Sequence, residues 1–245
     1  MKRILITFTA CLVVIQLNAQ RDYNAISLDL AGGLSMPLFP LTQIKQSDYI
    51  LSMHFDVGLK YMLSEYFGLR VNFTHDHFQS KSRNDDLQYT FNKYNRVALE
   101  GVYNITRKLG VNCNEYFNTL VFIGGGVTYA FPGSLKRYND TGVFAFGIEP
   151  ENSSRYERIG NVVLGLRPQV RFSSSLALKF DVAYVHNLEQ QYFFNGELVD
   201  ANRTKIKAGF LSLGIGIKFY IGLNYEHADW LPQDVEYKTI SLKRK

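Results

Sequence analysis

Apolar and polar residues alternate with a period of two along much of this sequence. Between Leu51 and Met62, for example, the apolar residues are Met53, Phe55, Val57, Leu59 and Tyr61, and the residues between them are Ser52, His54, Asp56, Gly58 and Lys60. Successive side chains of a β-strand point to opposite faces. The segment therefore predicts a strand with one apolar and one polar face.

The same alternation recurs in seven further segments. It is clear in residues 69–74, 96–105, 162–172, 176–184 and 211–221. It is weaker in residues 24–35 and 119–131, where glycines blur the pattern. We therefore expect eight strands.

The first twenty residues predict export. Met1, Lys2 and Arg3 precede an apolar run over residues 4–17, and the small residue Ala19 follows it. This is the pattern of a secretory signal peptide, assigned here to residues 1–19. The run of about 14 residues is shorter than the ~20 needed to span a bilayer as a helix. It also continues past Cys11, so we expect cleavage after Ala19 and no lipid anchor.

Strand length and the charges on the polar face separate two all-β folds. A soluble sandwich has strands of about five or six residues, whereas a tilted transmembrane strand needs about 9 to 11. Several of the alternating runs reach the longer value. Their polar face carries Asp56, Lys60, Arg70, Arg96, Glu100, Arg167, Arg171, Lys179, Asp181 and Lys218. In a membrane barrel these residues face the lumen and the apolar face meets lipid. With the export signal, we predict an eight-stranded antiparallel up-and-down transmembrane β-barrel over residues 20–222.

Composition adds two expectations. The pI near 9.0 could indicate nucleic-acid binding, but loss of Lys2 and Arg3 with the signal lowers the formal charge from +5 to +3, and no long basic cluster remains. We expect no nucleic-acid partner.

Cys113 has no partner cysteine after the signal is removed, so no intramolecular disulfide can form. The aromatic content of 14% suits strands and the interfaces of a membrane.

Long and short connections alternate between the expected strands. Residues 37–49, 80–91, 132–157 and 187–204 are long and polar, whereas 64–66 and 173–175 are tight. Residues 107–118 make a longer connection on the tight side. This sidedness is typical of outer-membrane barrels with extracellular loops and periplasmic turns, and it places both termini in the periplasm. Pro168 has no backbone donor, so we expect a bulge or a weak point in the sixth strand.

The chain resembles the transmembrane domain of OmpA-type outer-membrane barrels. The resemblance covers residues 24–221 and rests on Glu65-Tyr66-Phe67-Gly68-Leu69-Arg70, on the last strand 213–220 and on Glu226-His227-Ala228-Asp229-Trp230. It implies a bacterial outer-membrane location among lipids and lipopolysaccharide, and a last strand read by the barrel-insertion machinery.

The segment after the barrel departs from that family. It resembles the link to a peptidoglycan-binding domain, but only 15 residues follow Trp230, too few for a folded domain. We therefore expect residues 223–245 to be a periplasmic tail. His227, Asp229 and Trp230 are its candidate contacts with another outer-membrane or periplasmic protein.

Few residues point to chemistry. An eight-stranded barrel can be filled by its own side chains, and we expect its charges to pair across a closed lumen. Asp76 with His75 and His77 could contribute to a metal site, although scattered surface histidines explain the same residues. Ser52, His54 and Asp56 share a strand face, but that face points away from lipid.

We therefore expect no catalytic residue, no metal and no cofactor. The predicted function is that of a non-catalytic outer-membrane protein, acting structurally or as an accessory subunit of a larger complex. A lipid-modifying enzyme and a small-solute channel are the alternatives.

Overall fold

The computed structural model describes residues 23–39, 49, 52–78, 87–88, 92–109, 116–131, 136–137, 156–194, 199, 202, 204–224 and 226–231. The predicted signal peptide, Cys113 and much of the predicted long connections lie outside these residues. Among the residues described, no helix is both long enough and apolar enough to cross a membrane.

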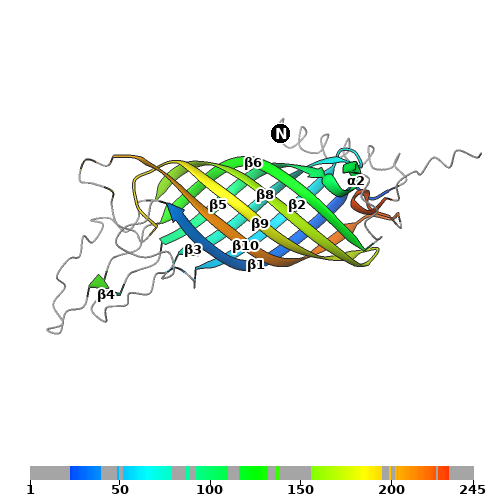
Figure 1. Cartoon of the computed structure of the whole chain (residues 1–245), viewed down its shortest axis with the longest axis horizontal. Helices are drawn as coiled ribbons and strands as arrows, with labels where there is room; N and C mark the ends of the chain where they lie inside the picture. Colours follow the sequence, from blue (N-terminus) through cyan, green and yellow to red (C-terminus); the bar gives the residue numbers. More distant parts are fainter. Residues whose placement is uncertain are drawn as a thin grey trace, which may run out of the picture.

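Eight long strands form a closed antiparallel barrel (Figure 1). They are β1 (Ile26–Phe39), β2 (Met53–Met62), β3 (Phe67–Phe78), β5 (Asn92–Asn104), β6 (Phe117–Phe131), β8 (Glu157–Ser173), β9 (Leu176–Gln190) and β10 (Ile206–Ile221). Each strand pairs with its neighbour along the chain, and β10 pairs with β1 to close the barrel. The predicted eight-stranded up-and-down barrel is confirmed.

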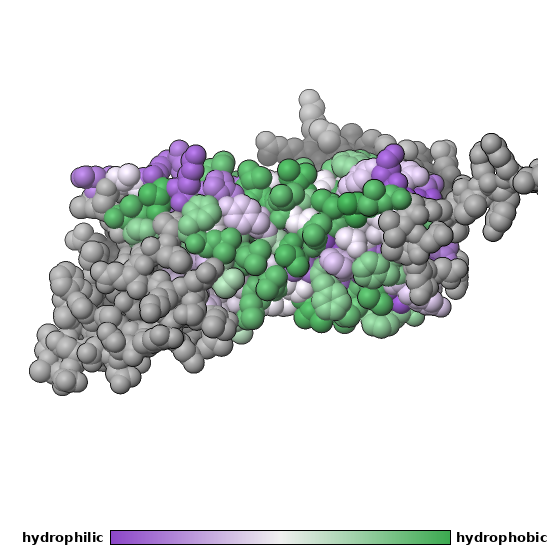
Figure 2. All heavy atoms as spheres, in the orientation of Figure 1, coloured by the Kyte–Doolittle hydropathy of each residue, from purple (hydrophilic) through white to green (hydrophobic). Residues whose placement is uncertain are grey.

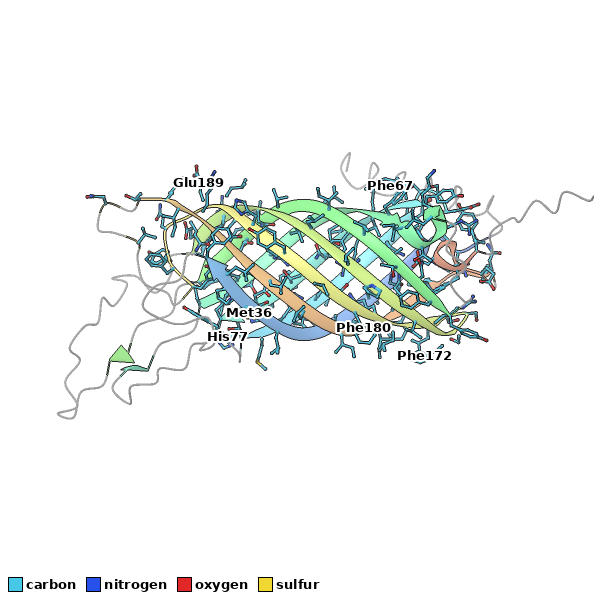
Figure 3. All side chains as sticks on the ribbon, viewed as in Figure 1. Met36, Phe67, His77, Phe172, Phe180 and Glu189 are labelled. Carbon is cyan, nitrogen blue, oxygen red and sulfur yellow. The ribbon has the colours of Figure 1, made fainter. Side chains whose placement is uncertain are left out.

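Four short elements lie at the two ends. β4 (Leu87–Gln88) pairs with β7 (Lys136–Arg137). α2 (Ile105–Leu109) follows β5 directly, and the 3-10 helix η2 (Ala228–Trp230) follows β10. α2 and η2 lie at the end with the tight turns, here called the short-connection end (Figure 1). Phe67 and Phe172 also lie there, whereas Met36, His77 and Glu189 lie at the opposite, long-connection end (Figure 3).

The strands run further than the alternation predicts, mainly at the long-connection end. β1 continues through Pro37 to Phe39, β9 continues to Gln190, and β10 begins at Ile206. Backbone pairing in the barrel does not depend on side-chain polarity, so the ladders continue where the apolar pattern stops. Residues 37–39 and 187–190, which the alternation placed in connections, are therefore strand.

Pro168 interrupts one of the two ladders of β8. The pairing of β8 with β9 runs from Leu166 to Gln169 without a change of register, but it skips Arg167 and Pro168. A weak point is thus present where the missing donor predicts it. The bulge lies farther along the strand, between Arg171 and Ser173.

The outer surface of the barrel is apolar. Side chains such as Leu59, Val71, Ile123 and Ile215 point outward and are each more than half exposed. Figure 2 shows this apolar surface over the middle of the barrel and hydrophilic residues toward its ends. A soluble protein rarely exposes so large a continuous apolar surface, whereas a transmembrane barrel requires one. The barrel is built to be surrounded by lipid.

Candidate functional site

The inside of the barrel holds a balanced set of charges. Among the described residues, the buried carboxylates are Asp29, Asp56, Asp76, Glu100, Asp181 and Asp229, and the buried cations are Lys60, Arg70, Arg96, Arg167, Lys179 and Lys218. All but Asp229 lie at inward positions of the strands. The six positive charges equal the six negative ones, and such balance is what burial of charge away from water demands.

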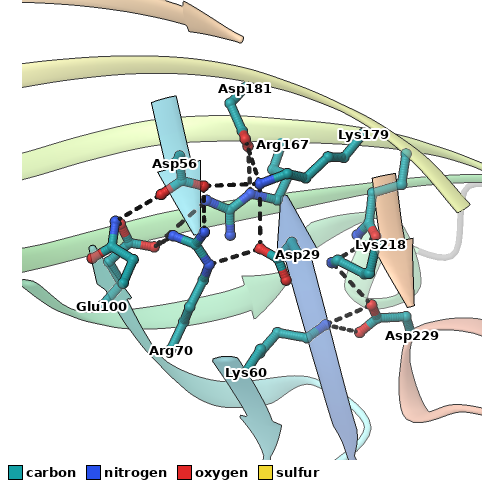
Figure 4. A network of polar contacts seen from close by, with 12 residues as sticks. Asp29, Asp56, Lys60, Arg70, Glu100, Arg167, Lys179, Asp181, Lys218 and Asp229 are labelled. Carbon is teal, nitrogen blue, oxygen red and sulfur yellow. Dashed lines mark hydrogen bonds and ion pairs between the residues drawn. The ribbon is translucent and has the colours of Figure 1, made fainter. Parts of the chain in front are cut away.

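Arg70 is the centre of the network (Figure 4). Its Nε atom donates to Asp29 at 2.8 Å, its Nη2 atom to Asp56 at 2.5 Å, and its Nη1 atom to Glu100 at 3.1 Å. Three strands thus contribute a carboxylate to one guanidinium. The guanidinium lies across Gly58, where a Cβ atom would overlap it.

Lys179 and Arg167 extend the network to the opposite wall of the barrel. The Nζ atom of Lys179 lies 3.3 Å from Asp29, 3.0 Å from Asp56 and 2.8 Å from Asp181. Arg167 donates to Asp181 and lies 3.5 Å from Glu100. Shared carboxylates join all these side chains into one cluster across the middle of the lumen (Figure 4).

Residues 226–230, here called the plug segment, enter the barrel at the short-connection end. Both carboxylate oxygens of Asp229 lie 2.5 Å from the Nζ atom of Lys60, and one lies 3.5 Å from that of Lys218. The side chains of Asn118 and Asn104 donate to the backbone carbonyl of Asp229, at 2.9 Å and 3.3 Å. The inner walls of β2, β5, β6 and β10 therefore hold this one residue.

Asn24 ties the plug segment to the first residues before β1. Its backbone N–H donates to the carbonyl of Glu226 at 2.8 Å, and its carbonyl accepts from Ala228 at 2.9 Å. Its side-chain oxygen accepts from the backbone N–H of Asn224 at 3.0 Å. Gly222, with a φ of 153°, makes the turn out of β10 that these contacts need, and a Cβ atom there would overlap Asn24.

His227 and Asp229 have shifted pKa values within the plug segment. Burial lowers the pKa of His227 to about 3, against the opposing effect of Asp229. Its neutral ring accepts a hydrogen bond from the backbone N–H of Asp229 at 3.0 Å. Burial favours the neutral acid of Asp229, but Lys60 and Lys218 outweigh it and hold the pKa of this carboxyl well below its usual value. At neutral pH His227 is thus a neutral imidazole and Asp229 a carboxylate.

Aromatic side chains fill the lumen at the long-connection end. The ring of Phe78 lies 4.9 Å from that of Phe194 and 5.1 Å from that of Phe210, and Tyr94 packs on the same cluster. Arg96 lies beside it, with its guanidinium 5.7 Å from the Phe210 ring. Its Nε and Nη1 atoms are buried and have no hydrogen-bond partner among the described residues.

The histidine candidates do not assemble as the sequence allowed. His54 lies 2.6 Å from Asp76, which also accepts from Ser35 at 2.6 Å. Asp56 is held by Arg70 and Lys179. The possible grouping of Ser52, His54 and Asp56 is therefore corrected, because the carboxylate opposite His54 comes from β3 and not from its own strand.

The possible metal site is not formed, because its three side chains point to opposite faces of β3. Asp76 points into the lumen, whereas His75 and His77 point outward on the same strand, and His75 lies 2.6 Å from Asn95. Within the described parts of the chain, no group of three metal-binding side chains occurs.

The predicted lumen residues lie inside the barrel, with one exception. Arg171 lies at the mouth, where it pairs with Glu226 at 2.9 Å and its guanidinium lies 5.9 Å from Trp230. The alternation missed Asp29, which lies in a glycine-rich segment, and Asp76, which follows the last clear repeat. Asp29 lies between the apolar residues Leu28 and Leu30, and Asp76 lies between the outward-facing His75 and His77. Strand parity alone could therefore have placed both carboxylates in the lumen.

The expectation that His227, Asp229 and Trp230 contact a partner is corrected. All three side chains are buried in the barrel mouth. The charge of Asp229 is neutralised there by two lysines, and Trp230 packs edge-on against Tyr220 with ring centres 6.4 Å apart. These groups stabilise the barrel itself.

Comparison with known proteins finds matches of low sequence identity among solved structures. No protein-family model and no curated protein sequence matches the chain. Among solved structures, Ail, the attachment invasion locus protein of Yersinia pestis, is 15% identical, with a TM-score of 0.45 over 80% of this chain and 99% of that one. Neisserial surface protein A is 10% identical, with a TM-score of 0.46 over 80% and 97%. The outer membrane protein OprG from Pseudomonas aeruginosa is 11% identical, with a TM-score of 0.47 over 82% and 98%.

Proposed function

We propose that the protein is a non-catalytic, non-conducting barrel of the bacterial outer membrane, which acts structurally or as an accessory subunit of a larger complex. One observation carries the proposal: described side chains occupy the lumen at both ends and across its middle. The plug segment fills the short-connection end, the Arg70 network crosses the middle, and the Phe78 cluster fills the long-connection end. Because the side chains inside the barrel contact one another, only the outer surfaces of the protein are available to a partner.

The charge balance argues against a channel. Each carboxylate of the central network is shared between cations, and Arg70 is fixed by three of them. An ion crossing the lumen would have to break several buried ion pairs, each costly to separate. A solute channel of this width would instead need a polar path filled with water.

The position of the polar groups argues against lipid chemistry. His54, Asp76 and Ser35 meet inside the barrel, on the face away from the lipid. A group that modifies a membrane lipid has to reach the outer face or the rim, and these three do not.

The long-connection end would face the outside of the cell and the short-connection end, with the plug segment, the periplasm. This orientation follows from the sidedness of the connections. The partners in this proposal are the surrounding lipids and lipopolysaccharide, the barrel-insertion machinery that reads β10, and a further outer-membrane or periplasmic protein. That protein would contact the outer face or the long connections, since the plug segment is occupied.

Two experiments test the proposal. The purified protein in planar lipid bilayers should show no conductance steps under conditions in which a general porin, as positive control, shows them. Steps from the wild-type protein would overturn the non-conducting part. Extraction from native membranes in mild detergent, followed by native electrophoresis, should return a complex larger than the barrel. Recovery of the barrel alone, with and without prior crosslinking, would contradict the subunit role.

A further inference from the structure

A cleft of about 750 Å³ opens at the long-connection end, between the ends of β8, β9 and β10. Its lining includes Tyr156, Arg158, Gly160, Leu188, Lys205 and Lys207. Glu189, labelled in Figure 3, also lines it, and hydrophilic residues gather at this end of the barrel in Figure 2. Glu157, at an inward position at the start of β8, also lines the cleft, whereas no lining residue named here belongs to the plug segment or to the Arg70 network.

The floor of the cleft belongs to the lipid-facing surface. Gly160 and Leu188 are outward-facing neighbours on β8 and β9, and a Cβ atom on Gly160 would lie 3.4 Å from Leu188. The next outward positions of β8 are Val162 and Leu164, both exposed and apolar. The apolar surface of the barrel therefore continues into the cleft without a break.

Aromatic residues beside the cleft mark the level of the membrane surface. Tyr156 lies 5.6 Å from Tyr129 and 5.9 Å from Phe131, measured between ring centres. Tyrosine rings gather where the hydrocarbon core gives way to lipid headgroups. The cleft thus spans this boundary, with its floor in the apolar region and its cations above.

Two of these cations have no carboxylate partner in the described part of the chain. Lys205 is paired with Glu189 at 2.6 Å, whereas no described carboxylate lies within ion-pair distance of Arg158 or Lys207. The guanidinium of Arg158 lies 5.5 Å from the Tyr156 ring and 5.8 Å from the Tyr129 ring, and its Nη2 atom donates to the Tyr156 hydroxyl at 3.1 Å. Among the described residues, the Tyr156 hydroxyl is the one hydrogen-bond acceptor of this guanidinium, whose planar donors match the geometry of a phosphate group.

We propose that this cleft binds the phosphate-bearing headgroup of a membrane lipid, with the phosphate between Arg158 and Lys207 and the acyl chains along Leu188 and Val162. The apolar floor distinguishes a lipid from a free phosphate, which would gain nothing from it. The inference rests on the proposed outer-membrane location and deepens it, because it assigns a binding site to one of the lipid partners.

Native mass spectrometry of the purified full chain in detergent provides the test. Three probes are titrated: lipid A with its phosphates, the same lipid after enzymatic dephosphorylation, and inorganic phosphate. We expect the phosphorylated lipid to bind at least about tenfold more tightly than either other probe, as two charge-assisted contacts predict. Equal binding of the dephosphorylated lipid, or binding of inorganic phosphate as tight as that of the lipid, would overturn the assignment.

Variants separate the cleft from general surface charge. R158Q/K207Q should lose about tenfold in affinity for the phosphorylated lipid. Gly160→Leu should lose a comparable factor without any change of charge, because the new side chain fills the floor. Lys93→Gln, an exposed outward-facing cation on β5, is the matched control and should bind as the wild type does. Wild-type affinity in both cleft variants would disprove the site. Heat-modifiable migration on a gel verifies that each variant is folded.

Discussion

The Nζ atom of Lys60 lies 2.5 Å from both carboxylate oxygens of Asp229, although 169 residues separate the two along the chain. Lys60 is in β2, and Asp229 lies beyond the last strand. Both side chains are fully buried. The contact makes the segment after the barrel part of the fold, because each of these two buried charges is neutralised most fully by the other.

Replacement of Asp229 by asparagine is expected to destabilise the barrel by roughly 3 to 5 kcal/mol, the cost of leaving a buried charge without its partner. Lys60 and Lys218 would both lose their carboxylate. Unfolding in urea, followed by the gel shift between folded and unfolded bands, measures the effect. Glu226→Gln removes the same charge from the same segment, but its partly exposed ion pair with Arg171 should contribute at most about 1 kcal/mol. Equal loss in the two variants would contradict the role of Asp229.

Acid is expected to release the plug segment. The pKa of buried His227 is about 3, whereas an unfolded histidine has a pKa near 6.5. Between these values the released segment binds a proton that the seated one does not, so stability falls as the pH falls from about 6.5 toward 3, by roughly 1 kcal/mol per pH unit. The depressed pKa of Asp229 acts in the same direction at still lower pH, because its stabilising charge is lost there.

Trp230 reports this release, since it is the only tryptophan in the chain. Its emission should shift to the red as the buried indole enters water, before the strands unfold. His227→Gln, which cannot take up the proton, should flatten the dependence between pH 6.5 and 4. A wild-type emission that stays constant over this range would refute the linkage.

Strand parity predicts most of the lumen, and it fails where the signal is not local. Residues such as Arg70 and Lys179 stand in clean alternation, so their inward direction follows from the sequence. The inward direction of Asp29 was not predicted, because the nearby Gly32 and Gly33 have no side chain and so do not show which face of the strand is apolar. The contact between Asp229 and Lys60 could not be predicted from the sequence, because two residues so far apart along the chain leave no local pattern around either of them.

Gly58 should be needed for the Arg70 network. A Cβ atom at this position overlaps the guanidinium, and Arg70 cannot move aside without leaving Asp29 and Asp56. Gly58→Ala is expected to cost about 3 kcal/mol or more of stability in the same urea assay. Gly32→Ala, on the outward face of β1, meets its nearest atom at 3.9 Å and should change stability by less than about 1 kcal/mol. Matching stabilities for the two variants would mean that Arg70 adapts freely.

The outward face offers a direct test that lipid surrounds the barrel. Ile215 lies near the middle of β10, more than half exposed and between Phe180 and Gly32 of the neighbouring strands. Ile215→Arg should cost about 2 to 4 kcal/mol when the protein is folded in bilayers, because a charge at mid-depth is poorly solvated. Leu223→Arg places the same charge in the fully exposed turn after β10 and should have almost no effect. If the barrel were surrounded by water, an exposed arginine would be harmless at both positions, so equal stabilities would disprove a transmembrane position for β10.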